Sequence, residues 1–255
     1  MFERLRRYWR LFGAGLGFFL IGMGGVLVFP LLHFFVWGRR RRMAAARFLI
    51  RSSFRFIVFL MDAFGVFHCD VLGRERLERG GLLILANHPS LLDIVLLMAF
   101  VRRADCIIKR GLWLNPFTHA TVRAAGYIRN DSGPDLLEAC IASLRSGSNL
   151  IIFPEGTRTT DDGSTALKRG AANVAVRGRC DVTPVLIRCA PRNVGKGRRF
   201  LRALSRSIHY TIEVREDIPI RPFLQQAGSE VLAARRLTDR LREYFGEDLK
   251  SSHAA

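Results

Sequence analysis

Two kinds of residue are scarce in this sequence: lysine throughout, and acidic residues in the first quarter. Only four of the 40 basic residues are lysine, and no aspartate or glutamate stands between Glu3 and Asp62. Eleven arginines against the single Glu3 give residues 1–61 a net charge of +10, more than half of the chain's +18. Arginine-rich composition can reflect the source of a protein, but arginines that flank apolar runs favour contact with anionic lipid head groups. Proteins that bind nucleic acid typically carry basic residues on a soluble face together with stacking aromatics. The arginines here flank hydrophobic runs instead, so we expect no nucleic-acid partner.

Cysteines with metal-ligand spacing are also missing. The five cysteines follow no C-x-x-C pattern and lie mostly in apolar runs, which is typical of buried thiols in a reducing compartment: Cys69, Cys106, Cys140, Cys180 and Cys189. The sequence has no G-x-S-x-G elbow that would provide a serine nucleophile. We therefore expect neither a bound metal nor a resident cofactor.

Charged residues are absent from Leu11 to Gly38, a run of 28 residues. This exceeds the ~20 residues that a helix needs to span a bilayer. The run is too long for a signal peptide, and no clear small-residue cleavage site precedes the arginines that follow. It fits either a tilted single span or a re-entrant helical hairpin that bends near Gly22, Gly24 and Gly25 or at Pro30. We favour the hairpin because it leaves both basic flanks on one side of the membrane; a buried helix of a soluble fold is the third alternative.

An arginine stripe marks the apolar stretch that comes next. Arg47, Arg51 and Arg55 recur every four residues, and phenylalanines fill many positions between them. Residues four apart share one helix face, so this helix could lie in a membrane interface with its arginines at lipid phosphates. The alternative is an ordinary charged face over a protein core. Upstream, Gly13-x-x-x-Gly17 is a spacing that lets two helices pack closely.

From about residue 70 the pattern becomes that of an α/β domain. Short apolar runs predict strands at Leu82–Ala86, Cys106–Lys109, Gly126–Arg129, Leu150–Phe153, Val182–Arg188 and His209–Val214. Helical patterns lie between them at Leu91–Val101, Pro134–Arg145, Ala166–Val176 and Glu230–Phe245. This alternation predicts an α/β fold, a mainly parallel or mixed sheet flanked by helices. We expect residues 62–255 to form this catalytic domain and residues 1–61 to be membrane-associated helices.

The most informative stretch is Leu82–Phe100, in which an apolar strand run breaks at Asn-His-Pro-Ser and a second apolar run follows. With Pro89 at the first helical position, His88 lies just outside the helix and Asp93 in its second turn. A carboxylate among leucines and isoleucines needs a partner, and His88 is the nearest candidate. An aspartate that holds an imidazole in one tautomer leaves the other nitrogen free to accept a proton from a hydroxyl. The alternative is that His88 caps the helix and Asp93 binds backbone elsewhere.

A second strand run, at Leu150, also breaks into proline, glycine and charge. It reads Leu-Ile-Ile-Phe-Pro-Glu-Gly-Thr-Arg and ends at Arg158. Ligands of open α/β sheets bind beyond the carboxyl ends of the strands. Because His88 and Glu155 each directly follow a strand run, we expect them at the same edge of the sheet and in one pocket.

His88-x4-Asp93 followed by Phe-Pro-Glu-Gly-Thr-Arg resembles the signature pair of the glycerolipid acyltransferase family, over roughly Leu82 to Ile187. The resemblance implies transfer of an acyl group from acyl-CoA or an acyl carrier protein to a lysophospholipid-type hydroxyl in phospholipid synthesis. His88 would be the general base and Asp93 its orienting partner. The implied contacts with the polar head of the acceptor come from Glu155, Gly156, Thr157 and Arg158.

Two further segments resemble family blocks more loosely. Lys109 and Arg129 occupy the interval between the main motifs and are candidate substrate contacts, as is Pro184 in the last strand-like block. The family commonly has an arginine close to the position of Asn130 here, so one phosphate contact of the family lacks its usual residue. Proline within a strand run otherwise indicates an edge or a bulge.

The acceptor consequently stays open between 1-acylglycerol 3-phosphate and another lipid-like alcohol, such as a lyso-ornithine lipid or a polyketide-type tail. A catalytically silent membrane scaffold and a hydrolase with water as acceptor are alternatives of other classes. The basic, apolar first quarter leads us to expect an anionic membrane surface as a partner. We expect the protein at the cytoplasmic (inner) membrane, with the catalytic domain facing the cytoplasm.

Overall fold

The structure is a computed structural model that describes residues 2–131, 135–157, 167–190 and 207–251. Its helices are α1 (Phe2–Phe35), α2 (Arg39–Ala63), the short 3-10 helix η1 (Arg74–Glu78), α3 (Asp93–Phe100), α4 (Arg110–Leu114), α5 (Pro116–Ala125), α6 (Asp135–Arg145), α7 (Gly170–Gly178), α9 (Arg221–Gln226) and α10 (Glu230–Ser251). Its strands are β1 (Phe67–Leu72), β2 (Leu83–Ala86), β3 (Ala104–Ile108), β4 (Ile128–Arg129), β5 (Asn149–Ile152), β6 (Val182–Ala190) and β7 (Ile208–Val214).

The strands form one mixed seven-stranded sheet in the order β1-β7-β6-β2-β5-β3-β4. All neighbouring pairs are parallel except β6 and β7, which are antiparallel. The predicted fold class, a mixed sheet flanked by helices, is confirmed. Because β2 and β5 are parallel neighbours, the segments that follow Ala86 and Ile152 leave the sheet side by side at its carboxyl edge.

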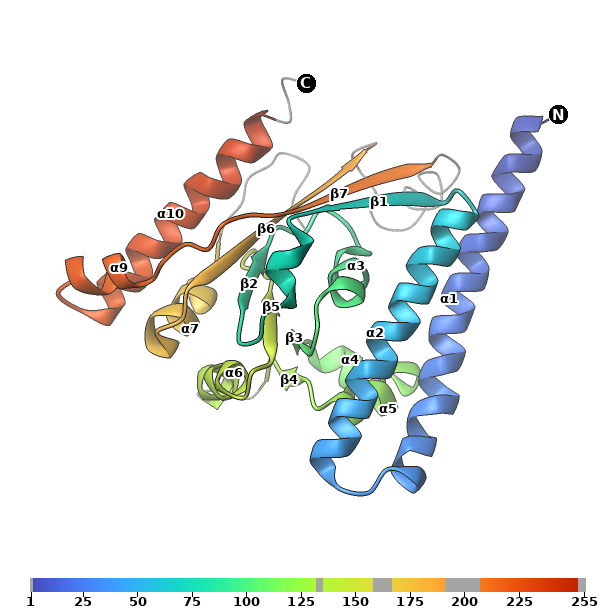
Figure 1. Cartoon of the computed structure of the whole chain (residues 1–255), viewed down its shortest axis with the longest axis horizontal. Coiled ribbons are helices and arrows are strands. Elements are labelled where there is room, and N and C mark those ends of the chain that lie inside the picture. Colours follow the sequence, from blue (N-terminus) through green and yellow to red (C-terminus); the bar gives the residue numbers. More distant parts are fainter. Residues whose placement is uncertain (1, 132–134, 158–166, 191–206, 252–255) are drawn as a thin grey trace.

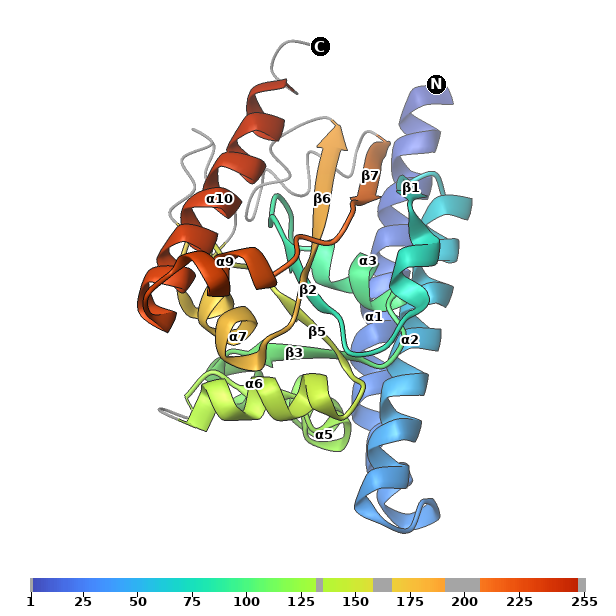
Figure 2. The same cartoon turned by 60° about the vertical axis from the view of Figure 1, so that its left-hand side comes forward.

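Helices cover both faces of the sheet (Figures 1 and 2). Alternate residues of β2 point to opposite sides, so Ile84 packs into the core under α1, α2 and α3. Its neighbours Leu83 and Leu85 pack into the second core, under α6, α7 and α10. A strand that is buried on both faces reads as a continuous apolar run, which explains why the sequence predicted β2 and β5 well.

The first two helices form an antiparallel hairpin beside the α/β domain (Figure 1). α1 continues without a break past Pro30, so the bend expected near Gly22–Gly25 or at Pro30 is wrong. The chain reverses instead between the two helices, where Gly38 has a φ of +88°. Arg4–Leu32 of α1 is long and apolar enough to cross a membrane by length and composition, with a mean hydropathy of 2.1 over an 18-residue window.

Close approach of α1 and α2 depends on glycine. A Cβ atom at Gly13 would lie 2.5 Å from Phe64, and one at Gly17 would overlap the Met61 methyl group. Both positions belong to the Gly13-x-x-x-Gly17 spacing, which therefore marks a helix contact in this structure. A larger residue at Gly13 would collide with Phe64 close to its backbone, whereas one at Gly17 would require the flexible end of Met61 to move.

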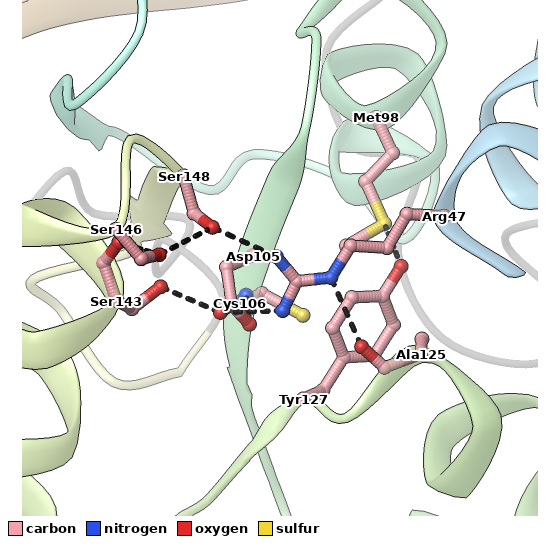
Figure 3. A network of polar contacts seen from close by, with 9 residues as sticks. All are labelled: Arg47, Met98, Asp105, Cys106, Ala125, Tyr127, Ser143, Ser146 and Ser148. Atoms are coloured by element: carbon pink, nitrogen blue, oxygen red, sulfur yellow. Dashed lines mark hydrogen bonds and ion pairs between the residues drawn. The ribbon is translucent and has the colours of Figure 1, made fainter. Parts of the chain in front are cut away.

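The arginine stripe of α2 lies against the domain at two of its three positions. The Arg47 guanidinium forms an ion pair with Asp105 of β3 at 2.7 Å and donates to Ser148 Oγ and the Ala125 carbonyl (Figure 3). Arg51 donates to the Phe100 carbonyl at 3.4 Å, whereas Arg55 is exposed. The expectation that the whole stripe meets lipid phosphates is therefore wrong, because the acceptors of Arg47 lie in the domain core.

Candidate active site

The site begins where β2 ends. The side-chain amide of Asn87 donates to the Ile187 carbonyl at 2.9 Å and accepts from the Ile187 N–H at 2.7 Å. Asn87 thus extends the pairing of β2 with β6 by one residue through its side chain. Both bonds are buried, and they fix the point at which the chain turns out of the sheet toward His88.

The turn after His88 differs from the predicted one. α3 begins at Asp93, not at Pro89, so Asp93 lies in the first helical turn. The Asp93 carboxylate accepts the Ser90 N–H at 2.7 Å and the Ser90 hydroxyl at 2.5 Å, and Ser90 Oγ accepts the Leu92 N–H. These local side-chain bonds compete with helix formation and hold Ser90–Leu92 in a bend.

His88 and Asp93 are in direct contact. His88 Nδ1 lies 2.8 Å from Asp93 Oδ2, and the Asp93 side chain is fully buried while that of His88 is 20% exposed. An ionised carboxylate can only accept hydrogen bonds, so Nδ1 is the nitrogen that carries the proton. Nε2 then keeps its lone pair, and His88 is poised to accept a proton at that atom. The Asp93 negative charge sits at the helix N-terminus, which also favours it.

The second motif meets the first at this point. Glu155 Oε1 accepts the backbone N–H of His88 at 3.2 Å, and Glu155 is only 6% exposed. The Phe153 ring stacks on the imidazole with centroids 4.2 Å apart and planes 20° apart. Residues that directly follow β2 and β5 therefore form one constellation at the carboxyl edge of the sheet.

Beyond Glu155 the motif turns outward. Gly156 and Thr157 are exposed. Gly156 has a φ of +67°, a backbone conformation that residues with a side chain rarely adopt. Arg158 lies outside the described residues. Lys168, which sequence reasoning did not single out, lies beside this turn: its N–H donates to the Pro154 carbonyl at 2.8 Å, and its Nζ would lie 2.8 Å from a Cβ at Gly156.

The loosely matched residues lie further from the dyad. Lys109 follows β3 and is exposed. Arg129, at the end of the edge strand β4, forms a two-pronged ion pair with Asp131 at 2.9 and 2.6 Å and lies over the Trp113 ring. This pair raises the pKa of Arg129 and lowers the pKa of Asp131. The Arg129 charge is consequently balanced within its own turn.

Pro184 lies in β6, one residue before the level at which the neighbouring strand β2 ends. It is buried in β6 opposite Leu85, one residue before the pairing of β6 with β7 begins at Val185. Its missing N–H therefore leaves no gap in that ladder, and its carbonyl accepts the Arg215 N–H at 3.0 Å. Pro184 shapes the strand at the point where β7 ends.

Burial raises the thiol pKa of four of the five cysteines, which argues against a nucleophilic thiol at those positions. All five are free, and burial raises the pKa of Cys69 and Cys140 to about 12 and that of Cys180 to about 11. A nucleophilic cysteine needs a lowered pKa and exposure instead.

Comparisons with known proteins find acyltransferases that are similar to this chain. The Acyltransferase family model matches residues 68–188. A 1-acyl-sn-glycerol-3-phosphate acyltransferase of Pseudomonas aeruginosa is 27% identical over 174 residues, which cover 66% of this chain and 68% of that protein. A chloroplastic 1-acyl-sn-glycerol-3-phosphate acyltransferase of Arabidopsis thaliana is 32% identical over 108 residues, or 40% of this chain and 30% of that protein. The plant, alga and nematode relatives are matched over 30% to 45% of their own length.

A solved structure shares the fold. The crystal structure of the 1-acyl-sn-glycerophosphate acyltransferase from Thermotoga maritima superposes with a TM-score of 0.68 over 96% of this chain and 98% of that one, at 22% sequence identity. At this identity the likeness is one of fold. Residues 68–188 are thus similar to the Acyltransferase family, and the chain shares its fold with the Thermotoga maritima enzyme.

Proposed function

We propose that the protein transfers an acyl group from an acyl-CoA or acyl carrier protein thioester to the hydroxyl of 1-acylglycerol 3-phosphate. The observation that carries the proposal is the bond between His88 Nδ1 and the buried Asp93 carboxylate, which leaves Nε2 as the proton acceptor. The named relatives act on 1-acyl-sn-glycerol 3-phosphate, which supports the choice of acceptor.

The reaction needs no covalent enzyme intermediate because a thioester is already activated. His88 Nε2 removes the proton of the acceptor hydroxyl as its oxygen attacks the thioester carbonyl carbon. The imidazolium that forms is stabilised by the Asp93 carboxylate. When the tetrahedral intermediate collapses, the carbon–sulfur bond breaks and the leaving thiolate takes the proton from His88. The products are an ester and a free thiol.

The acceptor phosphate needs cationic partners near the carboxyl edge of the sheet. Arg158 and Lys109 are the sequence-based candidates, and Lys168 is a further one because its ammonium group lies over Gly156. Glu155 and Thr157 are proposed to contact hydroxyl groups of the acceptor. Arg129 is a weaker candidate because Asp131 already neutralises its charge.

The helical hairpin is proposed to hold the enzyme at an anionic membrane. Large apolar side chains are exposed along both helices, among them Trp9, Phe12, Phe19, Phe34, Phe56 and Phe59. Exposed apolar side chains combined with arginines are typical of helices that enter a bilayer interface. We propose that the protein is at the cytoplasmic membrane with its catalytic domain facing the cytoplasm.

An acceptor panel tests the proposal. The full-length protein in phospholipid nanodiscs is supplied with acyl-CoA or acyl carrier protein thioester and one acceptor: 1-acylglycerol 3-phosphate, 1-acylglycerol, a lyso-ornithine lipid, or none. We expect ester formation with the first acceptor and its loss in His88→Ala. Transfer that survives His88→Ala would overturn the mechanism. Preference for an acceptor without phosphate would overturn the substrate, and fatty acid release without an acceptor would indicate a hydrolase.

A further inference from the structure

Behind the His88–Asp93 pair lies a chain of buried hydroxyl groups that reaches β7. The Tyr210 hydroxyl donates to Ser90 Oγ at 3.1 Å, and Ser90 Oγ in turn donates to Asp93 Oδ1 at 2.5 Å. Ser90 itself is fully buried. This series of hydrogen bonds joins residues that are 120 positions apart in the sequence. Tyr210 belongs to β7, which is separated from β2 by β6 in the sheet.

The number of protons available fixes which group donates in each hydrogen bond of this series. The Asp93 carboxylate accepts three times, from the Ser90 N–H, the Ser90 hydroxyl and His88 Nδ1. A serine hydroxyl has one proton, which Ser90 gives to Asp93, so Ser90 Oγ must accept from both Tyr210 and the Leu92 N–H. Burial raises the pKa of Tyr210 above its usual value, so its hydroxyl keeps the proton that it donates.

A tyrosine at this position costs free energy unless it bonds. Tyr210 is fully buried, and its ring packs edge-on against Phe67 with centroids 5.5 Å apart. Phenylalanine would fill the same space, and a buried hydroxyl without a hydrogen-bond partner is unfavourable. The Tyr210 hydroxyl is therefore stabilised by its hydrogen bond to Ser90, and Ser90 in turn donates to the Asp93 carboxylate.

We propose that Tyr210 and Ser90 are positioning residues that hold Asp93, and through it His88, in the tautomer and orientation that acyl transfer requires. The inference rests on the proposed function, which assigns His88 as the base. Ser90 acts directly on the carboxylate, and Tyr210 acts through Ser90. Neither hydroxyl touches the reacting atoms, so their removal lowers kcat and leaves KM for both substrates within about twofold.

A double-mutant cycle tests this order. Tyr210→Phe is expected to lower kcat roughly three- to tenfold, and Ser90→Ala roughly ten- to a hundredfold because its bond goes to a charged group. Ser90→Thr keeps a hydroxyl and is expected to recover most of the loss. In the Ser90→Ala background, Tyr210→Phe is expected to have no further effect, since its only route to Asp93 is gone.

A matched control separates positioning from the general cost of losing a buried hydroxyl. Tyr127 is also buried, and its hydroxyl contacts Met98 Sδ at 3.8 Å. Tyr127→Phe is expected to keep kcat within about twofold of the wild type. An unchanged kcat in Tyr210→Phe, a loss confined to KM, or an equal loss in Tyr127→Phe would each overturn the inference, as would additive losses in the cycle.

A second measurement requires no substrate. In protein labelled with nitrogen-15 histidine, the ring resonances of His88, assigned with a His88→Gln variant, report which nitrogen is protonated. We expect the Nδ1–H form in the wild type and a mixture of tautomers in Ser90→Ala. A wild-type Nε2–H form would overturn the positioning role. Failure of the proposed function would appear differently, as an inactive wild type with the Nδ1–H form intact.

Discussion

The backbone N–H of His88 donates to the side-chain carboxylate of Glu155, so the two halves of the site are bonded to each other and not merely adjacent. The contact joins the end of β2 to the end of β5, which are parallel neighbours. Stacking of Phe153 on the His88 ring adds a second contact between the same two segments. A substitution in the segment that contains Phe153 and Glu155 should therefore alter the position of His88.

Glu155→Ala tests this coupling. Removing the Glu155 carboxylate takes away the hydrogen-bond partner that it provides to the His88 N–H. We therefore expect a loss of roughly 1–3 kcal/mol in the free energy of unfolding together with a lower kcat. Glu155→Gln keeps a side-chain oxygen in the same place and is expected to retain stability within about 1 kcal/mol. Denaturant unfolding and steady-state kinetics on both variants check the prediction. Equal stability of the alanine variant and the wild type would contradict it.

Asp93→Asn tests the tautomer argument. The amide is nearly the same shape as the carboxylate, but it has no negative charge and can present an N–H toward His88 Nδ1. His88 would then be protonated at Nε2, the atom that we propose accepts the substrate proton. We expect kcat to fall by on the order of a thousandfold or more, with the secondary structure intact by circular dichroism. Asp239→Asn, on the exposed face of α10, is the control and is expected to keep wild-type kcat.

Much of the fold could be predicted because its central strands are apolar on both sides. β2 and β5 are such strands, and their predicted ends lie within one residue of the observed ones. β1 was missed because His68 and Asp70 interrupt its apolar pattern. α5 was also missed, although its signal is local: the Asn115 side chain accepts the Phe117 N–H, and Pro116 occupies the first helical position.

The support of the site could not be predicted, because it comes from residues distant in sequence. Asn87 pairs with Ile187, and Tyr210 reaches Ser90, only once β6 and β7 are in place. The start of α3 was misplaced for a similar reason. Pro89 favours a helix that begins at that residue, but the hydrogen bonds from Ser90 to Asp93 keep residues 90–92 in a bend, so that the helix begins at Asp93. Local propensity was overridden by side-chain hydrogen bonds.

Arg47→Ala is expected to loosen the hairpin from the domain. Its side chain is 12% exposed and ends on the buried Asp105 carboxylate, which would be left without its charged partner. Breaking a buried pair by removing one partner costs roughly 3–5 kcal/mol. Arg55 stands two turns later on the same helix and is exposed, so Arg55→Ala is the matched control and should change stability by less than about 0.5 kcal/mol. Equal midpoints of thermal unfolding for the two variants would contradict the prediction.

Glu213 makes stability depend on acid pH. Its bonds with Arg215, together with the charges of Arg215 and Arg188, lower the pKa of the Glu213 carboxyl below its usual value. A lowered pKa in the folded state adds stability that is present above the ordinary glutamate value and is lost as pH falls through the folded value. Thermal unfolding of the wild type and of Glu213→Gln should therefore differ at pH 7 and converge below about pH 4. A constant difference across that range would contradict the prediction.

Lys168 offers the sharpest test of where the acceptor phosphate binds. Its backbone is bonded to Pro154 and its ammonium group lies over Gly156, so it is fixed beside the turn that follows Glu155. Lys168→Ala is expected to raise KM for 1-acylglycerol 3-phosphate roughly tenfold and to leave kcat within about threefold, because a charge-assisted contact to the ground-state phosphate is lost. KM for an acceptor without phosphate should not change. Arg177→Ala, at the exposed far end of α7, removes one positive charge as a control. An equal rise in KM for both acceptors would mean that Lys168 acts on the turn and not on the phosphate.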